Sequence, residues 1–213
     1  MPRIGSWSSP RPPPSSLLAA RPDLAQVKAK YALPEAFLFY PARFWRHKNH
    51  LKLLEAFARI SGAHPDVHLV FTGDDRPFSR VVRRKIEELG LSSRVLVLGC
   101  VDYGDLPALY RLSRMLVLPT LFESISIPIY EAFALKVPVC CSNKVGLPEQ
   151  VGEAAVLFDP EAPEDIADKV ISLLKDDALR ERLALSGYER ISHFDHEGYA
   201  RGLREVLERA SRE

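Results

Sequence analysis

The chain has few cysteines, and their arrangement fits neither a metal site nor a disulfide framework. Only Cys100, Cys140 and Cys141 occur among its 213 residues. They lack the paired spacing of a zinc site, and an odd number fits poorly with a set of disulfide bonds. We therefore expect buried, apolar cysteines in a protein of the reducing cytoplasm.

Long apolar runs are absent as well. No stretch of about eighteen apolar residues occurs, and the N-terminus lacks the apolar core of a signal peptide, so the sequence predicts no transmembrane segment. The aromatic and basic cluster FWRHK at 44–48 leaves peripheral attachment to the cytoplasmic face of a membrane open. A cluster this short is more typical of a loop or a ligand rim.

Neither sign of charge is in excess, because 29 Lys and Arg residues nearly balance 28 Asp and Glu residues. Nothing in the net charge predicts nucleic acid or an acidic membrane as a partner. An anionic ligand would have to be held by local groups.

The two common phosphate-binding motifs are missing. Neither G-x-G-x-x-G nor G-x-x-x-x-G-K-[ST] occurs, which argues against the usual dinucleotide fingerprint and against a P-loop kinase. No histidine has a carboxylate or cysteine partner at the spacing of a metal site. We therefore expect no metal and no cofactor, and we expect the histidines on the surface or at helix caps.

The composition changes near residue 20. Residues 1–20 hold several prolines among serines and show no periodicity that could bury a face. This segment is predicted to be a disordered tail or a truncated interdomain linker. Residues 21–213 are long enough for one large α/β domain with its own core.

Short apolar runs alternate with helical patterns through this domain. The runs are apolar on both faces, as in a buried parallel sheet, and lie at 37–40, 67–71, 95–98, 115–118, 137–141 and 154–158. The pattern predicts a Rossmann-like, doubly wound parallel sheet of about six strands with helices on both faces. Extra helices are expected toward the C-terminus, the last at 199–210.

The segment 116–131, LVLPTLFESISIPIYE, is the most informative. It predicts a strand, a loop containing Glu123 and a helix whose first turns contain Glu131. Two such carboxylates serve either as a general acid and base on a sugar or, more simply, as acceptors for ligand hydroxyls. The alternative is structural: Glu131 favours the helix N-terminus by its charge, and Glu123 is solvated.

Two further groups follow strand ends. Arg43 and Lys48 come after the first strand, where a guanidinium and an ammonium group suit a diphosphate, although an ordinary basic loop would look the same. Gly73 follows the second strand and permits a close backbone approach or a sharp turn.

Taken together, three segments resemble the C-terminal, donor-binding half of retaining glycosyltransferases of the GT-B fold, family 4 (glycosyl transferases group 1). They are FYPARFWRHKNHLKLLEAF, HLVFTGDD and the long segment from RVLVLGCVDYG through LPTLFESISIPIYEAF to DIADKV. The resemblance runs from about residue 33 to 210. It implies one half of a GT-B fold.

The resemblance implies roles for individual residues. Arg43 and Lys48 would hold the donor diphosphate and stabilise the leaving nucleotide, and Glu123 would bind hydroxyls of the transferred sugar, so these three form the expected catalytic set. The expected donor-binding residues would meet the base, the ribose, the phosphates and the sugar; they are Gly73, Val101, Ser124, Ile125, Ser126 and Glu131.

The implied reaction is transfer of a glycosyl group from a nucleotide-sugar, such as a UDP-, GDP- or ADP-sugar, to an acceptor hydroxyl with retention. The acceptor would be a saccharide or lipid-linked, and an acceptor-binding domain or subunit would have to complete the enzyme, so this chain would be inactive alone. A non-catalytic module that binds a nucleotide-sugar or a protein is the alternative. Ser124 and Ser126 stand where the family often has glycines, which bears on donor preference.

Overall fold

The computed structural model describes residues 20–74 and 77–192, together with 200, 201, 204, 205, 207, 208, 210 and 211. The proline-rich segment up to residue 19 lies outside the described residues, and the last expected helix is described only in part. The proposed domain boundary near residue 20 therefore stays a prediction.

The described residues form a six-stranded sheet, and every neighbouring pair of strands is parallel. The strand order is β3-β2-β1-β4-β5-β6. The strands are β1 (Ala36–Pro41), β2 (Val67–Thr72), β3 (Val95–Val97), β4 (Met115–Leu118), β5 (Val139–Ser142) and β6 (Val156–Phe158). This is the predicted doubly wound, Rossmann-like sheet, and each predicted strand is present.

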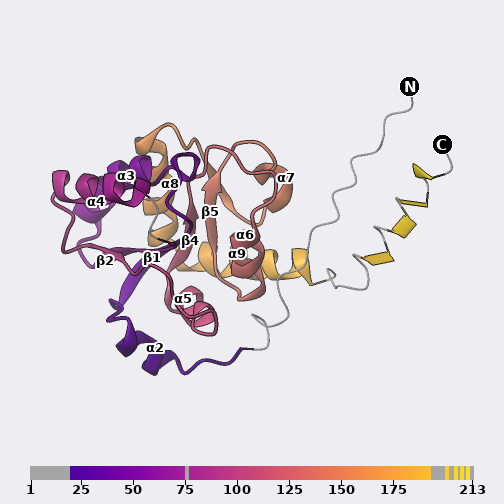
Figure 1. Cartoon of the computed structure of the whole chain (residues 1–213), viewed down its shortest axis with the longest axis horizontal. Helices are drawn as coiled ribbons and strands as arrows, with labels where there is room; N and C mark the ends of the chain where they lie inside the picture. Colours follow the sequence, from indigo (N-terminus) through magenta and orange to yellow (C-terminus); the bar gives the residue numbers. More distant parts are fainter. Residues whose placement is uncertain are drawn as a thin grey trace.

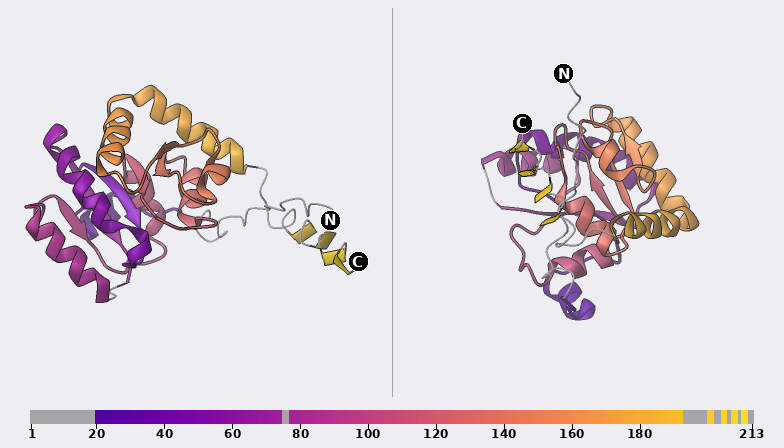
Figure 2. Two further views of the ribbon diagram at one scale, coloured as in Figure 1. Left: turned by 90° about the horizontal axis from the view of Figure 1, so that it is seen from above. Right: turned by 90° about the vertical axis from the view of Figure 1, so that its right-hand side faces the viewer.

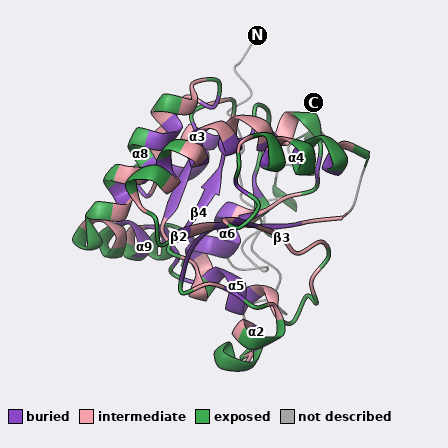
Figure 3. Ribbon diagram, turned by 90° about the vertical axis from the view of Figure 1, so that its left-hand side faces the viewer, coloured by how far each residue is buried: buried purple, intermediate pink, exposed green. Residues whose placement is uncertain are grey.

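Helices cover both faces of the sheet, as Figures 1 and 2 show. On one face lie α3 (His50–Ala63), α4 (Pro77–Glu88) and α8 (Pro163–Lys175), and on the other lie α5 (Leu106–Leu112) and α6 (Ile127–Ala134) (Figure 3). The shorter α2 (Leu24–Lys30) packs on α5, and α9 (Asp177–Ile191) packs on α6 and α8. A five-residue helix, α7 (Leu147–Val151), follows β5.

The core is continuous through the sheet. The strands are buried on both faces because their side chains alternate between the two helical layers, and all residues from Ala36 to Tyr40 in β1 are buried. On α3, Leu53, Leu54, Phe57 and Ile60 are fully buried at helical spacing, so this helix turns one apolar stripe toward the sheet and α8.

The strand order reverses direction between β1 and β4, which are neighbours in space. Chain connections leave this point toward opposite sides, so a crevice opens beyond the carboxyl ends of these two strands. The loop with Arg43 and Lys48 follows β1, and the loop with Glu123 follows β4. The topology therefore brings the predicted site residues to one edge of the sheet.

Asn49 ties the loops at this edge together. Its backbone is left-handed, with φ of 59°, a conformation that asparagine tolerates better than most residues. The residue is 7% exposed, and its side-chain amide donates hydrogen bonds to the carbonyl oxygens of Pro119 (3.0 Å) and Pro160 (2.7 Å). One residue thus joins the loops after β1, β4 and β6.

Replacing Asn49 should destabilise the domain through these two hydrogen bonds. Asn49→Gly keeps the left-handed backbone and should lower the free energy of unfolding by roughly 1–3 kcal/mol, at about 1 kcal/mol for each lost bond. Asn49→Asp should cost more, because a carboxylate would face two carbonyl oxygens. Urea denaturation measures both, with the exposed Asn143→Asp as control. Equal stability of the Asn49→Asp variant and the wild-type chain would contradict this role.

Candidate functional site

The loop after β1 packs on buried aromatic side chains. Phe44 is buried between the more exposed Arg43 and Trp45, and its ring packs against His50 with centroids 4.7 Å apart. His50 begins α3, as expected for a helix cap, but it is fully buried rather than at the surface. Burial lowers the pKa of its imidazole to about 3, so the ring is neutral.

Tyr40 fixes the end of the same loop. Its hydroxyl donates a 2.7 Å hydrogen bond to the carbonyl oxygen of Lys48. Burial raises the pKa of Tyr40 well above its ordinary value, so the hydroxyl keeps its proton as a donor. The side chain of Lys48 therefore extends from a fixed backbone position, at the end of the short 3-10 helix η1 (Arg46–Lys48).

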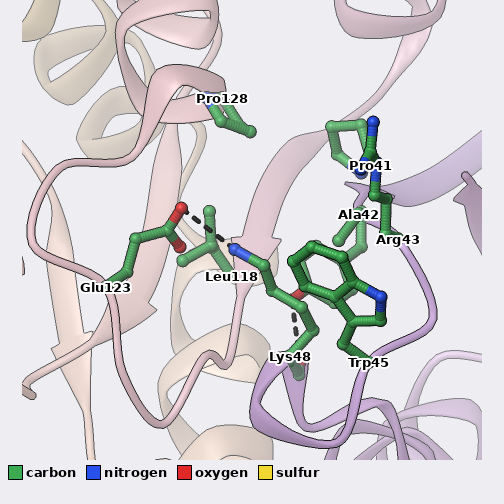
Figure 4. Close-up of a pocket in the computed structure, with 9 residues that line it drawn as sticks. Pro41, Ala42, Arg43, Trp45, Lys48, Leu118, Glu123 and Pro128 are labelled. Carbon is green, nitrogen blue, oxygen red and sulfur yellow. Dashed lines mark hydrogen bonds and ion pairs between the residues drawn. The ribbon is translucent and has the colours of Figure 1, made fainter.

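Lys48 reaches across to the loop after β4. Its Nζ lies 3.0 Å from Oε1 of Glu123, and the two side chains are only 18% and 15% exposed (Figure 4). The other carboxylate oxygen of Glu123 is buried and has no hydrogen-bond partner among the described residues. Buried acceptors normally have donors, so this oxygen lacks the partner that such a group usually has.

Arg43 lies apart from this pair. Its side chain is 59% exposed, its guanidinium lies over the Trp45 ring at 5.6 Å from the centroid, and its Nε is 3.9 Å from Oδ1 of Asp74. The guanidinium points away from Lys48 in Figure 4. An exposed arginine with one distant carboxylate can turn toward an anionic ligand without losing a strong bond.

These three residues share one pocket of about 270 Å³. Arg43, Lys48 and Glu123 line it, so the structure brings together the three residues predicted to be catalytic. The remaining walls come from the loop after β1, the strand ends and the first turn of α6; they are Tyr40, Pro41, Ala42, Trp45, Leu118 and Pro128. Figure 4 shows the Lys48–Glu123 pair between the two loops.

Gly73 has a steric role beside this pocket. Its φ is 149°, and a Cβ there would lie 2.3 Å from the carbonyl oxygen of Ala42, far inside van der Waals contact. Its N–H donates to the carbonyl oxygen of Gly99 at 2.9 Å. The glycine lets the ends of β1, β2 and β3 approach one another; its contact with a donor stays a prediction.

The segment Ser124–Ser126 divides into exposed and buried parts. Ser124 and Ile125 are exposed, whereas Ser126 is fully buried. The N–H of Ser126 donates to Oε1 of Gln150, and Nε2 of Gln150 donates to the carbonyl oxygen of Ser126, both at 2.8 Å. In this structure the Ser126 N–H is engaged by Gln150 and so supports the loop, and the contact of Ser126 with a donor stays a prediction.

Glu131 lies on the inner side of α6. It is 6% exposed, and Tyr110 on α5 donates a 2.6 Å hydrogen bond to its Oε2. Burial raises the pKa of Glu131, and the hydrogen bond from Tyr110 opposes that shift only in part. Nothing in the spacing of Tyr110 and Glu131 along the sequence indicates this contact.

Val101 lies in a turn that α2 holds. Tyr31 donates a 2.9 Å hydrogen bond to Oδ2 of Asp105 and accepts one of 3.2 Å from the N–H of Asp102. The ammonium group of Lys30 pairs with both of these carboxylates. The turn after β3, expected beside the base, is therefore fixed by residues far away in sequence.

Potential metal ligands are not clustered in the described part of the chain. Among those residues, no group of three or more histidine, cysteine, aspartate or glutamate side chains is arranged to hold a metal ion. Within the same residues, no helix combines the length and apolar character needed to cross a membrane.

Comparison with known proteins agrees with this geometry. The family model "Glycosyl transferases group 1" matches residues 25–190, most of the described chain. The chain belongs to the glycosyl transferases group 1 family. The family assignment made from the sequence motifs is thus confirmed.

Individual relatives agree with the family and with the fold. The chain is 39% identical over 173 residues to the O-antigen chain mannosyltransferase B of Escherichia coli, a match covering 80% of this chain and 45% of the relative. Sucrose-phosphate synthase from Thermosynechococcus elongatus superposes with a TM-score of 0.80 at 25% identity, over 95% of this chain and 52% of that one. The chain thus spans about half the length of these proteins.

A third comparison isolates the corresponding domain. The C-terminal domain of a glycosyl transferase group 1 family protein from Francisella tularensis superposes with a TM-score of 0.71 at 23% identity. The match covers 84% of this chain and 95% of that domain. The predicted architecture, one Rossmann-like half of a GT-B fold, is confirmed.

In this family member, Glu131 should reduce stability at neutral pH. Because its folded pKa lies above the unfolded value, the folded state binds more protons, and stability falls as pH rises above the ordinary glutamate pKa. Glu131→Gln keeps an acceptor for Tyr110 without a charge. It should therefore raise the free energy of unfolding at pH 7, with a smaller gain at pH 4, in urea titrations. An equal gain at both values, or a loss at pH 7, would contradict the assignment.

Proposed function

We propose that this domain binds a nucleotide-sugar and supplies the donor side of a retaining glycosyl transfer to an acceptor hydroxyl. The observation that carries the proposal is the pairing of Lys48 with Glu123 in the crevice beyond β1 and β4. A cation and a carboxylate held side by side there suit the two parts of such a donor, the charged diphosphate and the hydroxyl-bearing sugar.

Lys48 and Arg43 act on the diphosphate. When the bond between the anomeric carbon and the phosphate oxygen breaks, negative charge grows on the leaving nucleotide. An ammonium group on a fixed backbone and a guanidinium able to turn inward stabilise that charge more than they stabilise the ground state. Arg43 is exposed enough to move, and Lys48 is held by Tyr40.

Glu123 acts on the transferred sugar. A turn of the Glu123 side chain brings its unpaired Oε2, buried in this structure, to a hydroxyl of the sugar, close to Lys48. The same carboxylate thereby links the sugar to the cation that holds the diphosphate. This coupling orients the anomeric carbon for attack.

The nucleoside would lie on the side of α6 and the turn after β3. Glu131 would accept hydrogen bonds from ribose hydroxyls, and Val101 would lie beside the base. Ser124 and Ile125, which are exposed, would face the phosphates and sugar through their backbone. Gly73 would line the same cleft at the end of β2.

The transferred group is proposed to be a hexosyl group, with mannosyl the first candidate because the Escherichia coli relative is a mannosyltransferase. UDP, GDP and ADP remain the candidate nucleotides. The acceptor is proposed to be a saccharide or a lipid-linked saccharide, and the site of action the cytoplasm or the cytoplasmic face of a membrane.

Transfer is proposed to need an acceptor-binding domain or subunit as well, because Arg43, Lys48 and Glu123 are all proposed to serve the donor. The second candidate is a module that binds a nucleotide-sugar without turnover, since the Lys48–Glu123 pair requires binding alone. Nucleotide release distinguishes the two candidates. Each nucleotide-sugar is incubated with this chain and an acceptor-binding partner, with and without acceptor saccharides. Nucleotide released in the presence of an acceptor indicates transfer, and no release indicates a binding module.

Calorimetry with UDP, GDP and ADP, and with their sugars, tests the donor site. We expect binding of one nucleotide series. Lys48→Ala and Arg43→Ala should each weaken it roughly 10- to 100-fold, as expected for a charge-assisted hydrogen bond. Arg59→Ala, at an exposed position on α3, is the matched control and should bind as the wild-type chain does. Absence of binding to all three series would refute the proposal.

Glu123→Gln should separate the two parts of the donor. Removing the carboxylate beside Lys48 leaves that cation unpaired, so the nucleoside diphosphate alone should bind severalfold more tightly, in line with about 1 kcal/mol for a partly solvated charge pair. The added affinity that the sugar contributes should fall. An unchanged ratio of nucleotide-sugar to nucleotide affinity would exclude contact of Glu123 with the sugar.

A further inference from the structure

Gln150 holds the loop between the two glutamates. It lies on α7, is 8% exposed, and both ends of its amide bond the backbone of Ser126 at 2.8 Å. This pairing satisfies the N–H and the carbonyl of a fully buried residue at once. Ser126 is the residue immediately before α6, so the pairing fixes where that helix begins.

The turn before α7 supports the same loop at a second point. A Cβ on Gly146 would lie 2.2 Å from the carbonyl oxygen of Ser124, so the two backbones touch where only glycine fits. The preceding Val145 has a φ of 52°, a conformation that a β-branched residue rarely adopts. The segment Ser124–Ser126 is therefore held against α7 and its turn at both ends.

Helix α7 is itself fixed by α9. Arg190 donates from Nε to the carbonyl oxygen of Gln150 and from Nη2 to that of Glu149, both at 2.8 Å. These are carbonyls at the end of a helix too short to bond them internally. A continuous set of hydrogen bonds thus runs from α9 through α7 to the loop that follows Glu123.

We infer that Gln150 is a positioning residue for the donor site, acting through Ser126. By fixing the loop after Glu123 and the start of α6, Gln150 keeps the Glu123 carboxylate facing Lys48. It also keeps Glu131 in its buried position on α6. Without it, the buried N–H and carbonyl of Ser126 would lack partners, and the loop would move to reach water. The inference rests on the proposed function in taking this crevice as the donor site.

Two substitutions test the clamp, meaning the pair of hydrogen bonds between the Gln150 amide and the Ser126 backbone. Gln150→Met fills a similar volume without hydrogen bonds. Gln150→Glu is isosteric, and its protonated form can donate to the Ser126 carbonyl and accept from the Ser126 N–H as glutamine does, whereas its ionised form cannot donate. Hydrogen exchange of backbone amides, followed by NMR as protection factors from pH 5 to 8, reports the state of Ser126.

We expect the Ser126 amide to lose protection in Gln150→Met at every pH. In Gln150→Glu it should be protected at low pH and lose protection as the carboxyl ionises. Amides of β1 and β4 should stay protected in both variants. Gln26→Glu, at an exposed position on α2, is the control for the added charge and should leave Ser126 unchanged. Wild-type protection of Ser126 in Gln150→Met would overturn the clamp.

Binding of the nucleotide-sugar identified for the wild-type chain tests the positioning role. Gln150→Met should weaken it about tenfold, as for loss of one to two net hydrogen bonds, and Gln150→Glu should lose affinity only as pH rises. The loss should be smaller for the nucleoside diphosphate, because Glu123 meets only the sugar. Lost protection at Ser126 with unchanged affinity would overturn the positioning role. A wild-type chain that binds no nucleotide would refute the proposed function alone, since the exchange result stands by itself.

Discussion

Pairing of polar groups between the loops after β1 and β4 is the constraint on which this domain depends. Lys48 has its carbonyl bonded by Tyr40 and its ammonium group bonded by Glu123, so one residue joins the sheet to both loops. Asn49, the next residue, donates hydrogen bonds to two carbonyl oxygens, one in the loop after β4 and one in the loop after β6. The polar groups that pair here are largely buried, so few of them can stay unpaired, and the unpaired oxygen of Glu123 is therefore informative.

The sheet could be predicted because strands buried on both faces are apolar throughout, and the alternation of strand and helix leaves few possible topologies. The closeness of Lys48 to Glu123 could not be derived from spacing, and only the family resemblance suggested it. The partners of Gln150 and Tyr110 were missed because each hydrogen bond joins elements whose separation the tertiary fold alone determines. The resemblance implies that Ser126 meets the donor, which stays a prediction, and it gave no sign that the Ser126 backbone bonds Gln150.

Backbone contacts, rather than side chains, set how closely the loops approach one another. Gly73 lies against Ala42, and Gly146 lies against Ser124, at distances that exclude a Cβ. The two serines at 124 and 126 are accommodated differently: Ser124 is exposed, whereas Ser126 is buried and its backbone bonds Gln150. Replacement of glycine near a ligand thus need not crowd the crevice, because the chain can direct a new side chain outward or into the support behind the loop.

The pairing of β1 with β4 has a consequence for how the crevice comes into being. Residues Leu38 and Phe39 align with Met115 and Leu116, whereas β1 and β2 are joined by a single intervening helix. Closing the longer loop carries the larger entropy penalty, so this contact is expected to form late. During synthesis, the half containing β1, β2 and β3 emerges from the ribosome before β4 does. The groups that would meet the ligand therefore face one another only after the chain has joined its two halves, and a fault in that step would abolish binding while leaving much of the secondary structure in place.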